Sequence, residues 1–274
     1  MRATRHTGGA ISLAYDIEGS GPLVVFLHGI GGNRTNWEGQ LETFSNKFCA
    51  VSWDARGYGA SDDPPQTLKF SDYADDLVRL LDHVKAERAH FVGLSMGGMI
   101  IQDFYGRYPE RVATLSLVDT SSGFGGVPEE VQRDFLARRL EPLEKGLKPP
   151  DIAPGLVEVL VAKNASAAVR EQLRASLAAL RVEPYKQALH AIVTTDFRSV
   201  LPRISVPTLV IVGEEDSVTP PSASEFLVKN IPGALLMKIP RAGHLTNIEQ
   251  PETFDSALAA FLDRHAQRAS VVSL

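Results

Sequence analysis

The sequence contains little that would link the chain covalently or place it in a membrane. Cys49 is the single cysteine among 274 residues, which excludes an internal disulfide and leaves a small core residue as its simplest interpretation. No run approaches the roughly 18 apolar residues that a membrane helix requires. The first ten residues, MRATRHTGGA, lack the apolar core of a signal peptide. We therefore expect a soluble cytoplasmic protein with no membrane partner.

Charge of one sign is not concentrated anywhere along the chain. The net charge is −5, and acidic and basic residues are interspersed without a basic stripe or a like-charge tail. This pattern argues against a nucleic-acid partner. The length suits one domain, or one domain that carries an insert. The oligomeric state is left open, with a homodimer among the options.

Motifs for metal ions and nucleotide cofactors are also missing. The chain has neither HExxH nor paired cysteines. The glycine-rich segment GIGGNR (29–34) lacks the third glycine of a dinucleotide-binding loop, and no Gly-Lys-Ser/Thr follows it. We therefore expect no metal and no cofactor.

Short apolar segments alternate with amphipathic helices over much of the chain. Segment 12–19 alternates in polarity and is typical of an edge or hairpin strand, and helices are expected over 70–84 and from Met96 to Tyr108, where Pro109 ends the second one. Continuously apolar segments, typical of strands covered on both faces, occur at 23–28, 48–53, 89–94, 112–119, 206–213 and 234–240. This alternation predicts an α/β fold with a mostly parallel central sheet flanked by helices.

The alternation stops between about Gly123 and Ser199. That stretch has helical stripes of apolar residues separated by Gly- and Pro-rich joints, and no convincing strand. We interpret 123–199 as a helical cap insert over the sheet, and 1–122 together with 200–274 as the core.

One serine lies among glycines where a buried strand is expected to become a helix. The segment is GLSMGG (93–98), with Ser95 at its centre. A turn this tight strains its central residue, and glycines let the backbone pass closely. It would expose the hydroxyl of Ser95 at the carboxyl edge of the sheet, beside the N–H groups of a helix N-terminus. A turn with no chemical role is the alternative, but the flanking strand and helix favour an acyl-transfer nucleophile.

A serine hydroxyl requires a base that removes its proton. We favour His244, because it follows segment 234–240 in a loop at the carboxyl side of the sheet, where Ser95 also emerges. His90 opens the strand that leads to Ser95, at the wrong end, and His190 lies in the helical insert. The histidines are His6, His28, His83, His90, His190, His244 and His265.

The base in turn needs a carboxylate that holds its tautomer. A buried strand ends at Gly213 and is followed by Glu214, Glu215 and Asp216. The two glutamates are interpreted as solvated charges. Asp119, at the end of the strand after the serine, is the competing acid. We favour Asp216 because the chain order Ser…Asp…His is then satisfied.

A tetrahedral intermediate also requires donors for its oxyanion. The backbone N–H of Met96 lies at the first turn after the serine. A second donor should come from the loop HGIGGN (28–33), whose glycines allow close approach to a ligand, and Ile30 N–H is favoured. Trp37, just after this loop, is either a pocket wall or a packing residue.

Five motifs in order resemble those of the α/β-hydrolase superfamily, over residues 23–261. They are the strand with its HG loop, WDARGYGASD, GLSMGG, GEED after a helical insert, and GHLTNIEQPETF. The resemblance implies that Ser95, Asp216 and His244 are nucleophile, acid and base, that the two donors named above form the oxyanion hole, and that the insert is a cap that shapes substrate choice.

Within the superfamily the chain is most similar to the 3-oxoadipate enol-lactonase and carboxylesterase group. Carbon–carbon hydrolases usually carry asparagine before the serine and an aromatic residue after the histidine, where this chain has Leu94 and Leu245. We expect a cofactor-free serine hydrolase that cleaves a carboxylic ester or lactone through an acyl-enzyme on Ser95. The alternatives are carbon–carbon hydrolysis or perhydrolysis at the same triad, or a small-molecule receptor.

Arginines of the insert are the remaining candidates for substrate binding. They could hold a substrate carboxylate, or they could form a solvated helix face. The five are Arg133, Arg138, Arg139, Arg170 and Arg174.

Overall fold

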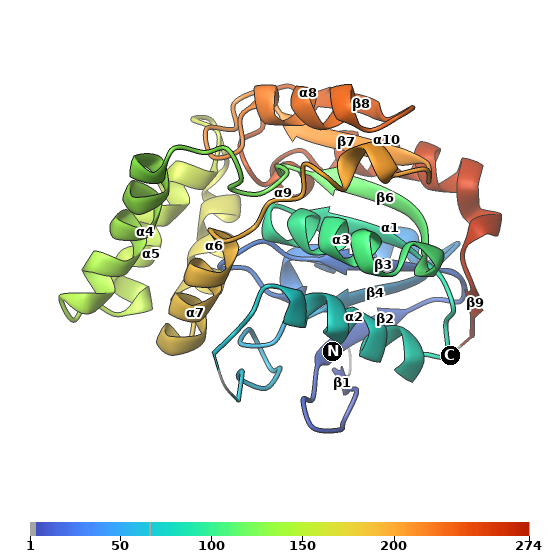
Figure 1. The fold of residues 1–274 in the computed structure, drawn as a ribbon, viewed down its shortest axis with the longest axis horizontal. Coiled ribbons are helices and arrows are strands. Elements are labelled where there is room, and N and C mark those ends of the chain that lie inside the picture. The colour runs from blue at the N-terminus through green and yellow to red at the C-terminus, as the bar shows by residue number, and fades with distance from the viewer. Residues whose placement is uncertain (1–3, 66, 274) are drawn as a thin grey trace.

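A twisted sheet runs through the centre of the protein, whose computed structural model describes residues 4–65 and 67–273 (Figure 1). The strand order is β1-β2-β4-β3-β5-β6-β7-β8, with β9 paired to β3. Strands β4 to β8 pair in parallel along this order, while β1, β2 and β9 are antiparallel to their neighbours. The bounds are β1 Arg5–His6, β2 Ala14–Glu18, β3 Gly21–Leu27, β4 Cys49–Trp53, β5 Ala89–Leu94, β6 Val112–Val118, β7 Thr208–Gly213, β8 Leu235–Ile239 and β9 Val271–Val272.

Helices cover both faces of this sheet, so the predicted α/β fold with a mostly parallel sheet is confirmed. Buried residues form two large clusters. One joins the sheet to α2 (Ser71–His83), α3 (Met96–Arg107) and α8 (Pro221–Asn230), and the other joins it to α1 (Glu38–Phe44) and α10 (Pro251–His265). In β3, alternate residues belong to opposite clusters, which explains why the strand is continuously apolar.

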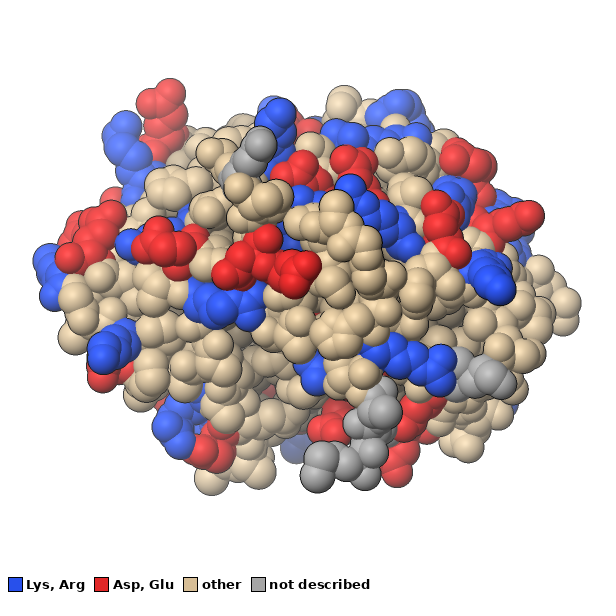
Figure 2. Space-filling view, turned by 90° about the horizontal axis from the view of Figure 1, so that it is seen from below, with Lys and Arg blue, Asp and Glu red and all other residues tan. Residues whose placement is uncertain are grey.

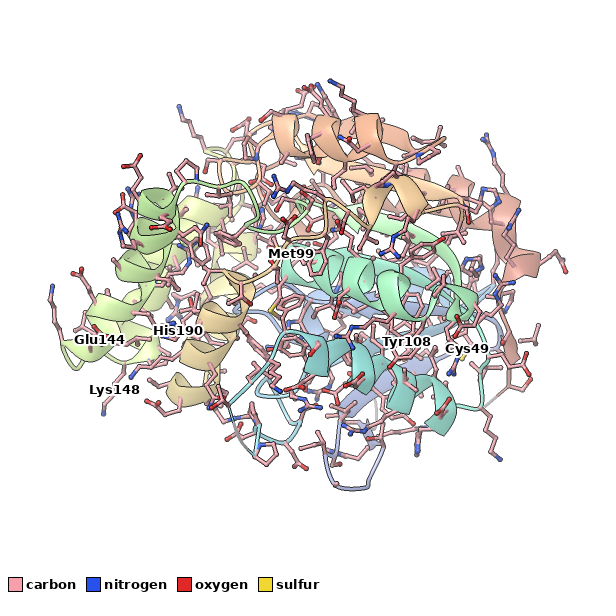
Figure 3. All side chains as sticks on the ribbon, viewed as in Figure 1. Cys49, Met99, Tyr108, Glu144, Lys148 and His190 are labelled. Atoms are coloured by element: carbon pink, nitrogen blue, oxygen red, sulfur yellow. The ribbon has the colours of Figure 1, made fainter. Side chains whose placement is uncertain are left out.

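Four helices connect β6 to β7 and lie together at one end of the sheet (Figure 1). They are α4 (Glu129–Glu144), α5 (Pro149–Leu160), α6 (Ala167–Ala178) and α7 (Val182–Ile192). Figure 3 shows Glu144 and Lys148 at their outer tip, and Cys49 and Tyr108 at the opposite end of the molecule. The helices therefore stand at the carboxyl ends of the parallel strands, where β5 passes into α3.

The last strand of the sheet corrects one expectation. Segment 234–240 is predicted to be buried on both faces, but β8 is an edge strand in which Leu235 is 52% and Leu236 36% exposed. An apolar run does not reveal whether a strand has one neighbour or two, and β8 pairs only with β7. Cys49, by contrast, is fully buried as predicted.

On the face shown in Figure 2, acidic and basic side chains are intermixed without a large patch of one sign. In the part of the chain that the structure describes, no helix has both the length and the apolar character that crossing a bilayer demands.

Candidate active site

Ser95 occupies a strained turn between β5 and α3. Its backbone has φ 53° and ψ −115°, and α3 begins at the next residue. A Cβ on Gly97 would lie 2.4 Å from the carbonyl oxygen of Leu27, so this position needs glycine. Ser95 N donates to Val118 O at 2.9 Å, and the hydroxyl of Thr120 donates to Ser95 O at 2.7 Å. The end of the neighbouring strand β6 and the residues just after it therefore hold the turn in place.

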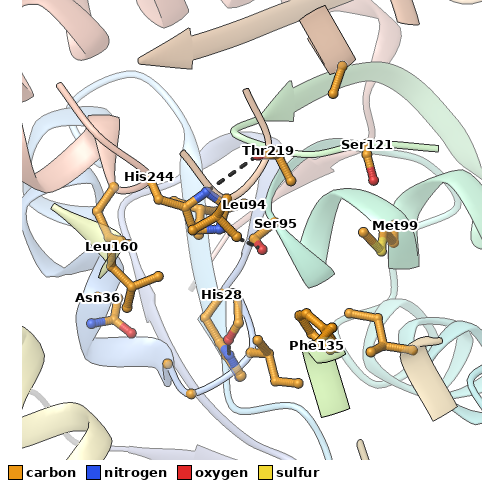
Figure 4. A pocket seen from close by; sticks show the side chains of 18 of the residues that line it. His28, Asn36, Leu94, Ser95, Met99, Ser121, Phe135, Leu160, Thr219 and His244 are labelled. Atoms are coloured by element: carbon orange, nitrogen blue, oxygen red, sulfur yellow. Dashed lines mark hydrogen bonds between the residues drawn. The ribbon is translucent and has the colours of Figure 1, made fainter. Parts of the chain in front are cut away.

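The structure brings three predicted side chains into one chain of hydrogen bonds. His244, in the loop after β8, places Nε2 2.9 Å from Ser95 Oγ and Nδ1 2.8 Å from Oδ2 of Asp216, in the loop after β7. Figure 4 shows the imidazole beside the serine hydroxyl. All three side chains are buried. The parallel strands β5, β7 and β8 end at the same edge, and this brings residues far apart in the sequence together.

The carboxylate of Asp216 is held by its own loop. Oδ1 accepts from the backbone N–H groups of Val218 at 2.8 Å and Thr219 at 3.0 Å, and Oδ2 accepts from the Thr219 hydroxyl at 2.9 Å. Burial alone would raise the pKa of Asp216, but the charge and hydrogen bond of His244 and these N–H donors lower it below its ordinary value. Asp216 therefore stays ionised and can hold the Nδ1 proton of His244.

The pKa of His244 is raised above its ordinary value of 6.5. Burial would lower it, but the negative charge and hydrogen bond of Asp216 outweigh burial, and the charge of Asp119 adds to them. The surroundings of His244 thus stabilise the protonated imidazole. A general base requires this, because it holds the transferred proton for part of the reaction.

Asp119, the competing acid, lies close to this site but does not contact the imidazole. Its Oδ2 accepts from the backbone N–H of Thr246 at 3.1 Å and from its hydroxyl at 2.7 Å, and its Oδ1 accepts from Gly213 N at 2.9 Å. Burial, and then the charge of Asp216, raise the pKa of Asp119 to about 7. Asp119 thus connects the end of β7 to the loop that carries His244.

The loop after β3 passes directly against Ser95. A Cβ on Gly29 would lie 3.1 Å from Ser95 Cβ, and Ile30 borders the same cavity as Ser95. Met96 is the first residue of α3, so its N–H has no acceptor within the helix. The two backbone groups predicted as oxyanion donors thus belong to segments that meet at the serine.

His28 holds this loop, a role that the sequence reasoning missed. Its Nδ1 donates to the carbonyl oxygen of Gly29 at 2.8 Å, and its Nε2 accepts from Ala55 N at 3.1 Å. One neutral tautomer satisfies both bonds, and burial lowers the pKa of His28, which favours that neutral form. The available signal was its place directly before the glycine loop. The hydroxyl of Thr219 was also missed, and its signal was the spacing Asp-x-x-Thr.

Ser95 and His244 open onto a cavity of about 330 Å³ between the sheet and helices α4 to α7. Its walls are mainly apolar and include Leu173 and Leu177 of α6. Trp37 borders it but is fully buried and packs against Phe26, with ring centroids 5.1 Å apart, so it is both wall and packing residue. Over residues 4–65 and 67–273, no cluster of three or more His, Cys, Asp or Glu side chains is suited to a metal ion.

Comparison with known proteins places this geometry in a family. The family model for the alpha/beta hydrolase fold matches residues 22–251. The chain belongs to the α/β-hydrolase family. This α/β-hydrolase is 31% identical over 245 residues to 3-oxoadipate enol-lactonase 2 of Acinetobacter baylyi. The aligned region covers 89% of each chain.

Two further similarities extend the comparison. The hydrolase is 31% identical over 265 residues to a pimeloyl-[acyl-carrier protein] methyl ester esterase of Chromobacterium violaceum, covering 93% of this chain and 100% of the relative. The enol-lactonase structure from Burkholderia xenovorans LB400 matches with a TM-score of 0.84 and 25% identity, covering 95% of this chain and 100% of the other. The resemblance to the superfamily and to its enol-lactonases is confirmed, and the protein is a hydrolase.

Proposed function

We propose that this hydrolase cleaves a carboxylic ester or lactone through an acyl-enzyme on Ser95, without a cofactor. The observation that carries the proposal is the continuous hydrogen-bonded chain from Ser95 Oγ through His244 to Asp216, with distances of 2.9 and 2.8 Å. Such a chain lets the serine lose its proton as it attacks a carbonyl carbon.

The reaction proceeds in two halves. Ser95 Oγ attacks the carbonyl carbon while His244 Nε2 takes its proton, and Asp216 stabilises the imidazolium. The backbone N–H groups of Ile30 and Met96 donate to the oxyanion. Collapse of the tetrahedral intermediate breaks the bond to the alkoxy oxygen, which receives the proton from Nε2. Water, deprotonated by the same nitrogen, then attacks the acyl-enzyme. The bond from the acyl carbon to Ser95 Oγ breaks, Nε2 returns the proton to that oxygen, and the acid is released.

The insert 123–199 acts as a cap over this chemistry. Its helices supply apolar walls of the cavity, while the core supplies the triad. The cap therefore selects the substrate and excludes bulk water from the acyl-enzyme.

The test is a panel of lactones and 4-nitrophenyl esters, with Ser95→Ala as control. We expect multiple turnover by the natural chain and a loss of several thousand-fold or more in the variant. Hydrolysis by Ser95→Ala at a near-normal rate would refute the acyl-enzyme. Tight binding of these compounds without turnover would instead support a receptor.

A further inference from the structure

The five candidate arginines of the cap lie in different environments. Arg138 is exposed and borders a groove between α4 and α5, whereas Arg139 also borders the cavity that contains Ser95. The other three form ion pairs with glutamates of the cap: Arg133 with Glu129, Arg170 with Glu158, and Arg174 with Glu171.

Arg139 has no ion-pair partner among the residues that the structure describes. Its Nη1 donates to the carbonyl oxygen of Phe135 at 3.1 Å, and its guanidinium carbon lies 3.9 Å from the centre of the Phe135 ring. These contacts fix the side chain along α4 but leave most of its N–H donors unused. Burying a cation that has unused N–H donors and no ion-pair partner costs free energy. A bound ligand that supplies hydrogen-bond acceptors and a negative charge would remove this cost.

The walls of the cavity beside Arg139 are mainly apolar. Among the residues that line the cavity, Arg139 is the only Lys, Arg, Asp or Glu. Its charge reaches the catalytic base, since it opposes the protonation of His244. Figure 4 shows Phe135, the ring beneath the guanidinium, on the same cavity as Ser95 and His244. One positive charge therefore stands in the same low-dielectric space as the reacting groups.

Arg139 also lies where this cavity meets a groove on the outside of the cap. Val131, Phe135, Arg139 and Val218 border both spaces, and the groove continues between α4 and α5. A ligand that enters through this groove passes the guanidinium before it reaches Ser95.

We propose that Arg139 binds a carboxylate of the substrate, so that the preferred substrates are esters or lactones that carry a free carboxylate in addition to the bond that is cleaved. This inference rests on the proposed function. A planar guanidinium offers two parallel N–H donors that match a carboxylate. A single cation in an apolar cavity suits a singly charged anion better than a phosphate, which carries up to two charges at neutral pH.

The experiment compares two substrates that differ by one charge. These are mono-4-nitrophenyl suberate and its methyl ester, 4-nitrophenyl methyl suberate, and nitrophenolate release is followed for both. The natural chain should show the higher kcat/KM for the anionic ester. Arg139→Met should lower kcat/KM for that ester about 10- to 100-fold, mainly through KM, as expected for a lost charge-assisted pair. The neutral ester should change by less than about threefold.

Arg133→Met is the control, because it removes the same charge from an exposed position of α4 that borders neither the cavity nor the groove. It should leave the ratio between the two substrates unchanged. Arg139→Lys should restore part of the preference, since it returns the charge without the fork of donors. If Arg139→Met leaves the ratio unchanged while Ser95→Ala abolishes release, the carboxylate subsite is wrong and the hydrolase mechanism stands.

A binding experiment tests the carboxylate subsite at Arg139 independently of the proposed acyl-enzyme on Ser95. Monomethyl suberate is titrated calorimetrically into the Ser95→Ala protein, with and without Arg139→Met. Weaker binding in the double variant by about 10-fold or more supports the subsite even if Ser95 were not the nucleophile. Equal affinity, or equal absence of binding, in both proteins overturns the subsite.

Discussion

At the residue scale, two buried carboxylates act differently on His244. Asp216 contacts Nδ1 at 2.8 Å and is kept ionised by the imidazole and by its own loop. Asp119 touches Thr246 instead, and its pKa is raised to about 7. Both negative charges raise the pKa of His244. In the proposed mechanism Asp216 therefore holds the base, while Asp119 shifts the pH at which the base is neutral.

The first prediction concerns the acid side of the pH profile. His244 must be neutral to accept the serine proton, so kcat/KM should fall as the pH drops through its pKa. Because that pKa lies above 6.5, activity should decline at a higher pH than for an ordinary histidine. Asp119 is ionised mainly above about pH 7, so Asp119→Asn removes a negative charge that acts there, and the midpoint should move to lower pH. The measurement is kcat/KM from about pH 5 to 9, with thermal unfolding as a check on folding.

Asp216→Asn serves as the contrast for this prediction. Loss of the carboxylate at Nδ1 should lower kcat by about 10³- to 10⁴-fold. A profile for Asp119→Asn that overlays that of the natural chain would show that its charge does not reach the base.

At the element scale, the turn from β5 into α3 depends on close backbone approach. Strand β3 runs directly beside the start of α3, and a Cβ on Gly97 would meet Leu27 O at 2.4 Å and His28 O at 2.9 Å. These are backbone atoms of β3 and of the residue that directly follows it, so they have little freedom to move. The same packing brings the loop after β3 against the serine.

Gly97→Ala should therefore destabilise the protein and misplace the serine. Overpacking of this kind costs about 1–3 kcal/mol, and kcat should fall with it. Gly39→Ala is the control, because Gly39 lies exposed in α1 and a Cβ there meets nothing within 4 Å. The control should be neutral or slightly stabilising, by up to about 1 kcal/mol. Thermal unfolding is measured for both variants. Equal melting temperatures would contradict the predicted clash at Gly97.

Most elements near the site could be predicted from the sequence because their causes are local. Pro109 cannot continue a helix, and α3 ends at Arg107. Strand β5 matches segment 89–94 because it is buried along its whole length and the turn at Ser95 ends it. The prediction that β8 is buried on both faces was wrong, because β8 is an edge strand with a neighbour on one side only. The local sequence pattern does not indicate how many neighbours a strand has.

At the scale of the whole molecule, the cap is bound to the loop that carries the base. The backbone N–H of His244 donates to Leu160 O, at the end of α5, at 2.7 Å. Glu249 Oε2 accepts from Ala162 N at 2.7 Å, and its Oε1 accepts from Gly243 N at 3.0 Å and Leu245 N at 3.2 Å. One carboxylate thus connects cap and core on both sides of the histidine.

Glu249→Ala should weaken both the fold and catalysis. It leaves three backbone N–H groups without their acceptor, at a cost of about 1–3 kcal/mol for each group that water does not reach. It also frees the His244 loop, so kcat should fall. Glu252→Ala, on the exposed surface of α10, is the control and should change neither. Thermal unfolding and kcat/KM are measured for both, and matching values for the two variants would exclude the proposed coupling.

The sequence by itself determined the features that local sterics control: the glycine-flanked turn at Ser95, the end of α3, the alternation of strands and helices, and the family motifs. Only the tertiary structure decided between partners that local patterns do not distinguish. Asp119 and Asp216 both follow strands that end at one edge, and the packing of the loop that carries His244 selects Asp216. Arg138 and Arg139 are neighbours, and the orientation of α4 turns only one toward Ser95. The reason is physical, because backbone preferences at turns and helix ends come from residues adjacent in the chain, whereas the side chains that meet across the cavity depend on how every layer packs.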